Sequence, residues 1–126
     1  DEINLVSLKD MNVDLGWPFY EGDFEHQPFP SSFYLDSQKA PVFSERIGGL
    51  IGGHILKING KNFYTFGTLD GKLFAIEFQQ DGISKFEINY GKSDFAEGNF
   101  LLSIEKSREG ILLLSSSGLI LQIQDS

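Results

Sequence analysis

The chain has 126 residues, of which 40% are hydrophobic and 13% aromatic, so it holds enough apolar side chains for a packed core. Its net charge of -8 repels a nucleic-acid backbone, and we expect no nucleic-acid partner. The absence of cysteine excludes disulfides, thiolate metal sites and thiol nucleophiles. No apolar run reaches the roughly 18 residues of a membrane span.

The first 53 residues are interpreted as a strand followed by an irregular crossing segment. All four prolines fall there, with aromatic residues between them, and proline interrupts a strand because it has no backbone N–H. Residues 3–8 are the stretch of this segment that predicts a strand.

Residues 54–88 predict a four-stranded antiparallel meander. Their apolar, alternating runs are separated by Asn59-Gly60, Asp70-Gly71 and Asp81-Gly82, which are residue pairs typical of tight hairpin turns. The expected strands are residues 54–58, 61–66, 72–78 and 83–88.

Residues 99–124 predict three strands of a second meander, at residues 100–105, 111–115 and 119–123. A loose resemblance links Gly71-Lys72-Leu73-Phe74-Ala75-Ile76 to Gly118-Leu119-Ile120-Leu121-Gln122-Ile123, although two copies do not establish a repeat. Meanders of four short strands are typical of propeller blades. The sequence therefore predicts an all-β chain that is part of a β-propeller, with one complete four-stranded blade and most of a second.

Two blades leave a propeller ring open, with unpaired strand edges and an exposed apolar face. Such a segment is expected to associate with the remaining blades, in the same or another chain, or with itself. The alternative is an independent small β domain, which predicts a cooperative monomer.

A series of motifs resembles the glucose/sorbosone dehydrogenase family over nearly the whole chain. The motifs are, in order, Asp1-Glu2-Ile3-Asn4-Leu5-Val6, Gly16-Trp17-Pro18, Glu21-Gly22, Pro41-Val42-Phe43, Ile51-Gly52-Gly53, Phe63-Tyr64-Thr65-Phe66-Gly67, Gly71-Lys72-Leu73-Phe74-Ala75-Ile76 and Glu109-Gly110. The specificity of the resemblance comes from the order of these motifs. The resemblance implies the C-terminal third of a six-bladed propeller.

The resemblance also implies an extracytoplasmic or periplasmic oxidoreductase that binds pyrroloquinoline quinone with calcium and oxidises a sugar or related alcohol. The family's catalytic histidine and calcium-binding backbone would lie upstream of Asp1, so we expect no catalytic residue in this chain. Its quinone-contacting lysine would fall near Leu69, and its arginine pair between Phe100 and Leu102. Uncharged side chains there cannot make charge-assisted hydrogen bonds to quinone carboxylates, which argues against quinone binding of the usual kind.

Two functions from different classes follow. In the first, the chain is a fragment of a propeller that oxidises a sugar or related alcohol in the full-length protein. In the second, the chain belongs to a non-catalytic propeller scaffold that binds carbohydrate or protein, and Leu69 together with the missing arginines is the observation that suggests it.

The ligand-binding candidates are loop residues at the entry to each blade. Glu45 and Arg46 would present an acid and a cation, and His54 begins the innermost strand, where side chains approach a propeller axis. Asp94 and Asn99 lie in the corresponding loop of the second blade and would face the same end of the ring. An exposed ion pair and a hydrogen-bonded structural histidine are the alternatives.

Asp23 and Glu25, flanked by Glu21 and His26, supply oxygen ligands of the kind that calcium prefers. Their spacing does not follow a calcium-loop pattern such as Asp-x-Asp-x-Asp-Gly, and a solvated loop is the alternative. A metal site at Asp23 and Glu25 is therefore a hypothesis for titration with calcium.

Overall fold

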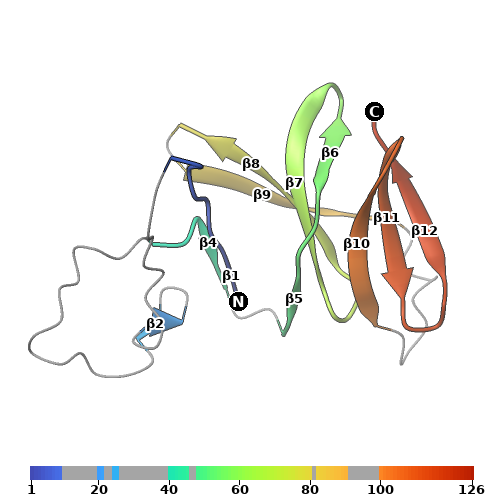
Figure 1. The fold of residues 1–126 in the computed structure, drawn as a ribbon, viewed down its shortest axis with the longest axis horizontal. Helices are drawn as coiled ribbons and strands as arrows, with labels where there is room; N and C mark the ends of the chain where they lie inside the picture. The colour runs from blue at the N-terminus through green and yellow to red at the C-terminus, as the bar shows by residue number, and fades with distance from the viewer. Residues whose placement is uncertain (10–19, 22–23, 26–39, 46–47, 81, 91–99) are drawn as a thin grey trace, which may run out of the picture. The chain divides into compact units, whose positions relative to one another are not determined.

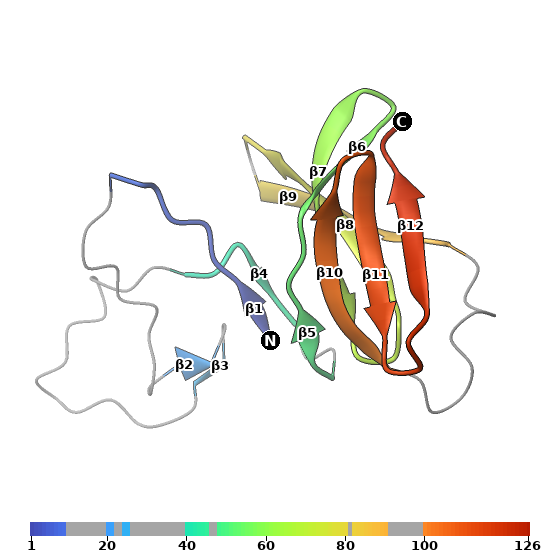
Figure 2. The same ribbon diagram turned by 45° about the vertical axis from the view of Figure 1, so that its right-hand side comes forward.

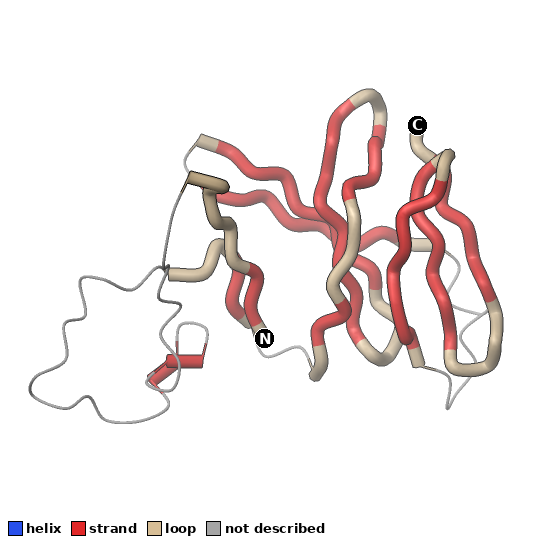
Figure 3. Tube along the Cα trace, viewed as in Figure 1, coloured by secondary structure: helices blue, strands red, loops and turns tan. Residues whose placement is uncertain are grey.

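The computed structural model describes residues 1–9, 20–21, 24–25, 40–45, 48–80, 82–90 and 100–126. Within them the chain is all-β, as the sequence predicts, and its sheets are open rather than closed into a ring (Figures 1 and 3). It divides into two compact units, Asp1–Arg46 and Ile47–Ser126. No helix in the described part is long and apolar enough to cross a membrane.

The first unit contains two short antiparallel strand pairs. They are β1 (Glu2–Ile3) with β4 (Phe43–Ser44), and β2 (Tyr20–Glu21) with β3 (Phe24–Glu25). The predicted strand over residues 3–8 is wrong beyond Ile3. The reason is that β4 offers only two residues to pair with, and Pro41, which has no backbone N–H, comes two residues before β4.

The first sheet of the second unit is an antiparallel meander. Its strands are β5 (Leu50–Ile51), β6 (Ile55–Ile58), β7 (Lys61–Thr68), β8 (Leu73–Gln79) and β9 (Gly82–Ile88). β5 and β6 pair with successive parts of the same edge of β7, so they form one interrupted strand. The four strands predicted over residues 54–88 are confirmed, and β5 extends the first of them backwards.

The hairpin between β6 and β7 has the two-residue turn that the sequence predicts. Asn59 and Gly60 both have positive φ angles, of 49° and 78°. These angles match the right-handed twist of the flanking strands, and asparagine and glycine adopt them at little cost. Ile58 therefore pairs directly with Lys61.

The second sheet is the predicted three-stranded meander, with β10 (Leu101–Ser107), β11 (Gly110–Ser115) and β12 (Ile120–Gln124). A register shift between Leu101 and Ser103 marks an irregularity near the start of β10. Figure 2 shows β10, β11 and β12 standing in front of the first sheet.

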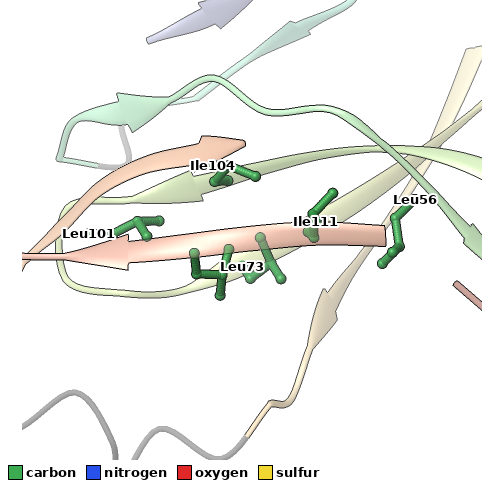
Figure 4. Close-up of a cluster of buried hydrophobic side chains, with 6 residues drawn as sticks. Leu56, Leu73, Leu101, Ile104 and Ile111 are labelled. Carbon is green, nitrogen blue, oxygen red and sulfur yellow. The ribbon is translucent and has the colours of Figure 1, made fainter. Parts of the chain in front are cut away.

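The two sheets of this unit pack face to face through one apolar cluster (Figure 4). Its buried members are Leu56, Leu73, Leu101, Ile104, Ile111 and Leu113. Gly67 lies where the sheets approach, since a Cβ added there would come within 2.3 Å of the Leu101 Cδ2. Burying a leucine or isoleucine side chain contributes roughly 1.5–3 kcal/mol, so this cluster is the main attraction between the sheets.

The last two residues join the second sheet to the β6–β7 turn, in an arrangement we call the terminal clasp. The Ser126 N–H donates to the Lys57 carbonyl at 2.9 Å, and the Ser126 carbonyl accepts from the Gly60 N–H at 3.0 Å. The Asp125 carboxylate accepts from the Lys57 N–H at 2.7 Å, and the Ser126 hydroxyl accepts from the Asn59 N–H at 3.1 Å. The clasp thus holds the end of β12 against a turn of the other sheet.

Candidate functional site

The structure describes some of the residues that the sequence predicts to bind a ligand or a metal ion, and the others lie outside the described ranges. Glu45 is exposed in the first unit, and its N–H donates to the Asp1 carbonyl at 3.2 Å. His54 lies in the second unit. Outside the described residues lie Arg46, Asp94, Asn99 and Asp23, whereas Glu25 is described only as a backbone position of β3. The grouping of the ligand-binding candidates around an axis stays a prediction, and so does the metal site at Asp23 and Glu25.

His54 is half-buried in the break between β5 and β6, where its backbone is firmly held. The His54 carbonyl accepts two hydrogen bonds from Thr65, from its N–H at 2.9 Å and its hydroxyl at 2.6 Å. The Gly53 N–H donates to the Tyr64 hydroxyl at 3.2 Å, and a Cβ at Gly53 would lie only 2.0 Å from the Thr65 carbonyl oxygen. Glycine is therefore required before His54, and β7 sets the place of the histidine.

The chain segments that lead into and between strands gather at one end of the second unit, which we call the turn end (Figure 1). It consists of the segment before β5, the β7–β8 turn, the start of β10 and the β11–β12 turn. The residues concerned are Gly48, Gly49, residues 68–72, Phe100 and residues 115–119.

The β7–β8 turn is organised by a buried hydroxyl. The Thr68 N–H donates to the Lys72 carbonyl at 2.9 Å, and the Thr68 carbonyl accepts from the N–H of Gly71, whose φ is 87°. The Thr68 hydroxyl accepts from the Lys72 N–H at 3.2 Å and donates to the Asp70 carboxylate. That hydrogen bond, helped by the positive charge of Lys72, lowers the pKa of Asp70 below its usual value of 3.8.

Tyr90 closes the other side of this turn, where its hydroxyl donates to the Gly71 carbonyl. Burial raises the pKa of Tyr90 above 10.0, and the negative charges of Asp70 and Glu87 raise it further. The phenol therefore stays protonated at neutral pH and remains a hydrogen-bond donor, so Tyr90 stabilises the turn rather than serving as a base.

The β11–β12 turn repeats the same geometry. The Ser115 N–H donates to the Leu119 carbonyl at 2.9 Å, and its carbonyl accepts from the N–H of Gly118, whose φ is 85°. The Ser115 hydroxyl accepts from the Leu119 N–H at 3.1 Å and lies 2.8 Å from the Ser117 hydroxyl. The Ser115 hydroxyl thus caps its turn in the same way as the Thr68 hydroxyl caps the turn of the first sheet. The loose sequence resemblance between the two segments corresponds to a repeated structure.

The tips of these turns connect successive elements in the same way. The Leu69 N–H donates to the Gly49 carbonyl at 3.2 Å, and the Ser116 N–H donates to the Phe100 carbonyl at 2.8 Å. Each tip therefore bonds to a residue just before the first strand of its own sheet. The Leu69 carbonyl also accepts from the Leu101 N–H at 3.0 Å, which links the first sheet to the second.

The turn end brings together the positions at which the family resemblance expects cations. Leu69 is 40% exposed, Phe100 is 51% exposed and Leu102 is 58% exposed. None of these side chains can neutralise a carboxylate, so they do not fit pyrroloquinoline quinone at its usual contacts. Each exposes an apolar side chain instead, Leu69 and Phe100 at the turn end and Leu102 at the start of β10.

Sequence reasoning did not select Lys72 or Thr68. Lys72 is an exposed cation at the turn end whose charge acts on Asp70, and Thr68 is the buried hydroxyl that holds that carboxylate. A signal was present in the sequence, because Thr68 and Ser115 each stand three residues before a turn glycine. A serine or threonine at that spacing in both meanders could have marked the pair of capped turns.

Within the described part of the chain, no group of three or more histidine, aspartate or glutamate side chains is placed to hold a metal ion. Comparison of the sequence and structure with family models, curated proteins and solved structures finds no match. The features that bear on function are therefore the sequence motifs and the geometry of the turn end.

Proposed function

We propose that the second unit forms two neighbouring blades of a β-propeller of the glucose/sorbosone dehydrogenase type, and that the protein containing them acts on a sugar or related alcohol. The observation that carries the proposal is that the two sheets of the second unit have the same organisation. Each sheet is an antiparallel meander with the same hydroxyl-capped turn, and the Leu101–Leu69 hydrogen bond joins one to the next. Propellers are built by repeating such a meander around an axis.

The exposed face of the second sheet supports the packing of a further meander against it. Alignment of Gly71 with Gly118 places Leu73 opposite Ile120 in the sequence. Leu73 is fully buried under the second sheet, whereas Ile120 is 61% exposed. A further meander packed on the second sheet would bury Ile120 in the way that the second sheet buries Leu73.

The sugar-oxidising role is supported by the ordered series of motifs from Asp1 to Glu109-Gly110. In this proposal the catalytic base lies outside the chain, and the two blades contribute architecture and one end of the binding surface. Because Leu69 and Phe100 do not fit the usual quinone contacts, no step of the oxidation is assigned to residues of this chain.

A non-catalytic scaffold that binds carbohydrate or protein is the second candidate, and the apolar turn end favours it. Leu69, Phe100 and Leu102 expose apolar surface where the resembling enzymes would hold an anionic cofactor. Such surface can pack against the apolar face of a sugar ring or against a protein side chain.

Calorimetric titration and a dye-reduction assay distinguish the two candidates. The chain, together with any longer polypeptide that contains it, is titrated with pyrroloquinoline quinone plus calcium and with a panel of aldoses and polyols. Oxidation that depends on added quinone supports the dehydrogenase, whereas sugar binding without oxidation supports the scaffold. A protein that neither binds nor oxidises any sugar contradicts the proposed action on sugars.

A Leu69→Lys variant sharpens this comparison. If the chain holds a quinone site that lacks only the lysine expected near position 69, the added ammonium group strengthens quinone binding through a charge-assisted hydrogen bond. Leu69→Met, which keeps an apolar side chain of similar size, is the matched control. Unchanged quinone binding in Leu69→Lys argues against a quinone site at the turn end.

A further inference from the structure

The hydrogen bonds at the two ends of β12 show which of its residues direct their backbone N–H and C=O groups toward β11. Near the start of β12, the Ser115 N–H donates to the Leu119 carbonyl, and just after its end the Asp125 N–H donates to the Glu109 carbonyl. The register between β11 and β12 is unbroken from one end to the other. Since hydrogen-bonded pairs recur at every second residue of an antiparallel ladder, the odd-numbered residues of β12 bond to β11.

The even-numbered residues of β12 therefore direct their backbone N–H and C=O groups away from the sheet. These residues are Ile120, Gln122 and Gln124, and their side chains are exposed. No described strand pairs with this edge, because β12 ends the order β10-β11-β12. A row of outward backbone groups on an edge strand is a template for pairing with another strand.

The first sheet shows what the corresponding edge looks like when it is occupied. Alignment of the two capped turns matches β8 with β12, and the far edge of β8 is covered along its whole length by β9. The second sheet lacks an equivalent of β9 among the described residues. The comparison within one chain thus indicates room for a fourth strand beside β12.

The edge of β12 also lacks the charges that protect the other edges of this unit. β9 carries Lys85 and Glu87, β10 carries Glu105 and Lys106, and β6 carries Lys57. β12 reads Ile-Leu-Gln-Ile-Gln, with no charged residue and no proline. Charged side chains and prolines are the usual devices that stop edge strands from pairing.

We propose that β12 pairs antiparallel with β12 of a second copy of this chain, about a two-fold axis at Gln122. In this register Gln122 faces its own copy and Ile120 faces Gln124, so every outward residue of the edge finds a hydrogen-bonded partner. Leu121 would face Ile123 on the core side, where both are now only partly buried. A two-fold contact of this kind is isologous and closes on itself.

Charge selects the antiparallel arrangement and this strand. The net charge of -8 opposes association of two copies in general, which favours contact through an uncharged strand. Antiparallel pairing about Gln122 places the two Asp125 residues at opposite ends of the contact, whereas parallel pairing would bring them together. The proposal depends on the edge of β12 and not on sugar binding or oxidation.

Light scattering after size exclusion, over a wide range of concentration, tests the proposal. The mass is expected to rise from 14.1 kDa toward twice that value as concentration increases. Gln122→Pro removes an outward N–H without breaking a bond to β11, and it should raise the dimer dissociation constant about tenfold or more. Gln122→Thr, which keeps the N–H, should still dimerise. A wild-type chain that stays monomeric overturns the proposal.

A charge pair at position 122 tests the register and covers the case in which the proline variant does not fold. Gln122→Lys and Gln122→Glu should each be monomeric, because two like charges would face each other across the axis. Mixing one isotope-labelled variant with the other should restore a mixed dimer, seen by native mass spectrometry. Dimers of either variant alone, or no mixed dimer, contradict pairing about Gln122.

Leu102→Lys separates the edge of β12 from the exposed face of the same sheet. Leu102 is exposed on β10, away from the edge, so this variant should dimerise like the wild type. If Leu102→Lys is monomeric while Gln122→Pro is dimeric, the copies meet through the exposed face and the proposal is wrong.

Discussion

At the scale of single residues, the two capped turns have the same backbone geometry, but their capping hydroxyl groups have different partners. The Thr68 hydroxyl donates to a carboxylate, whereas the Ser115 hydroxyl lies 2.8 Å from another hydroxyl. A hydrogen bond to a charged acceptor is stronger than one between neutral groups. The β7–β8 turn is therefore expected to be the more strongly held of the two.

Replacement of Thr68 by valine tests the importance of this hydroxyl. Thr68→Val keeps the shape but leaves the Lys72 N–H and the Asp70 carboxylate without their shared partner, so the free energy of unfolding should fall by about 1–3 kcal/mol. Thr68→Ser keeps the hydroxyl and should lose less. Urea denaturation measures both, and a valine variant as stable as wild type would refute the assigned role.

The lowered pKa of Asp70 predicts a pH dependence of stability. Because the folded pKa lies below the usual 3.8, the stability contributed by this carboxylate is present above pH 3.8 and is lost as the pH falls through the folded pKa. Asp70→Asn should cost about 0.5 kcal/mol at pH 7, as expected for an exposed charge. Denaturation at acid pH should show the gap between variant and wild type closing, and a constant gap counts against the prediction.

At the scale of elements, strands joined by tight turns could be predicted and the others could not. Asn59-Gly60 and the runs around it specify a hairpin locally, and the structure confirms it. Residues 3–8 also look like a strand, but pairing there depends on a distant and very short partner. Local pattern gives no information about the length of that partner.

The break between β5 and β6 gives a matched pair of variants. A Cβ at Gly53 would lie 2.0 Å from the Thr65 carbonyl oxygen, whereas at Gly52 the nearest atom is the Tyr64 hydroxyl at 3.8 Å. Gly53→Ala should destabilise the protein by about 2 kcal/mol or more, and Gly52→Ala should change stability by no more than about 0.5 kcal/mol. Thermal denaturation compares them, and equal effects would rule out the backbone contact as the cause.

At the scale of the whole molecule, the structure confirms the predicted all-β class and the strands of the two meanders, whereas the predicted grouping of the ligand-binding candidates stays a prediction. The candidates Glu45, Arg46, Asp94 and Asn99 are predicted to lie in loops, and Glu45 alone of the four falls within the described residues. Loop positions depend on packing that no sequence periodicity records. Leu69 lies in the β7–β8 turn, and Phe100, just before β10, accepts a hydrogen bond from Ser116 of the β11–β12 turn, so both lie at the turn end. The sequence marks these two positions only through the family resemblance, and their place at one end of the unit follows from the backbone hydrogen bonds of the turns.

Equivalent positions in the two sheets should respond differently to truncation. Leu73→Ala removes a fully buried side chain between the sheets and should cost about 2–5 kcal/mol. Ile120→Ala, at the matching exposed position, should change stability by no more than about 0.5 kcal/mol in dilute solution. Chemical denaturation at low concentration checks this, and a large loss in Ile120→Ala would mean that the exposed face is already covered.

The terminal clasp has a consequence for the order in which the protein assembles. Asp125 and Ser126 bond to residues 57–60, so they close one of the longest loops in the unit. During synthesis the β6–β7 hairpin emerges long before its partners at 125 and 126, and closure over so many residues is slow. Until then the hairpin depends on its turn and on the pairing of β7 with β5 and β8, and the clasp forms only after β12 has been translated.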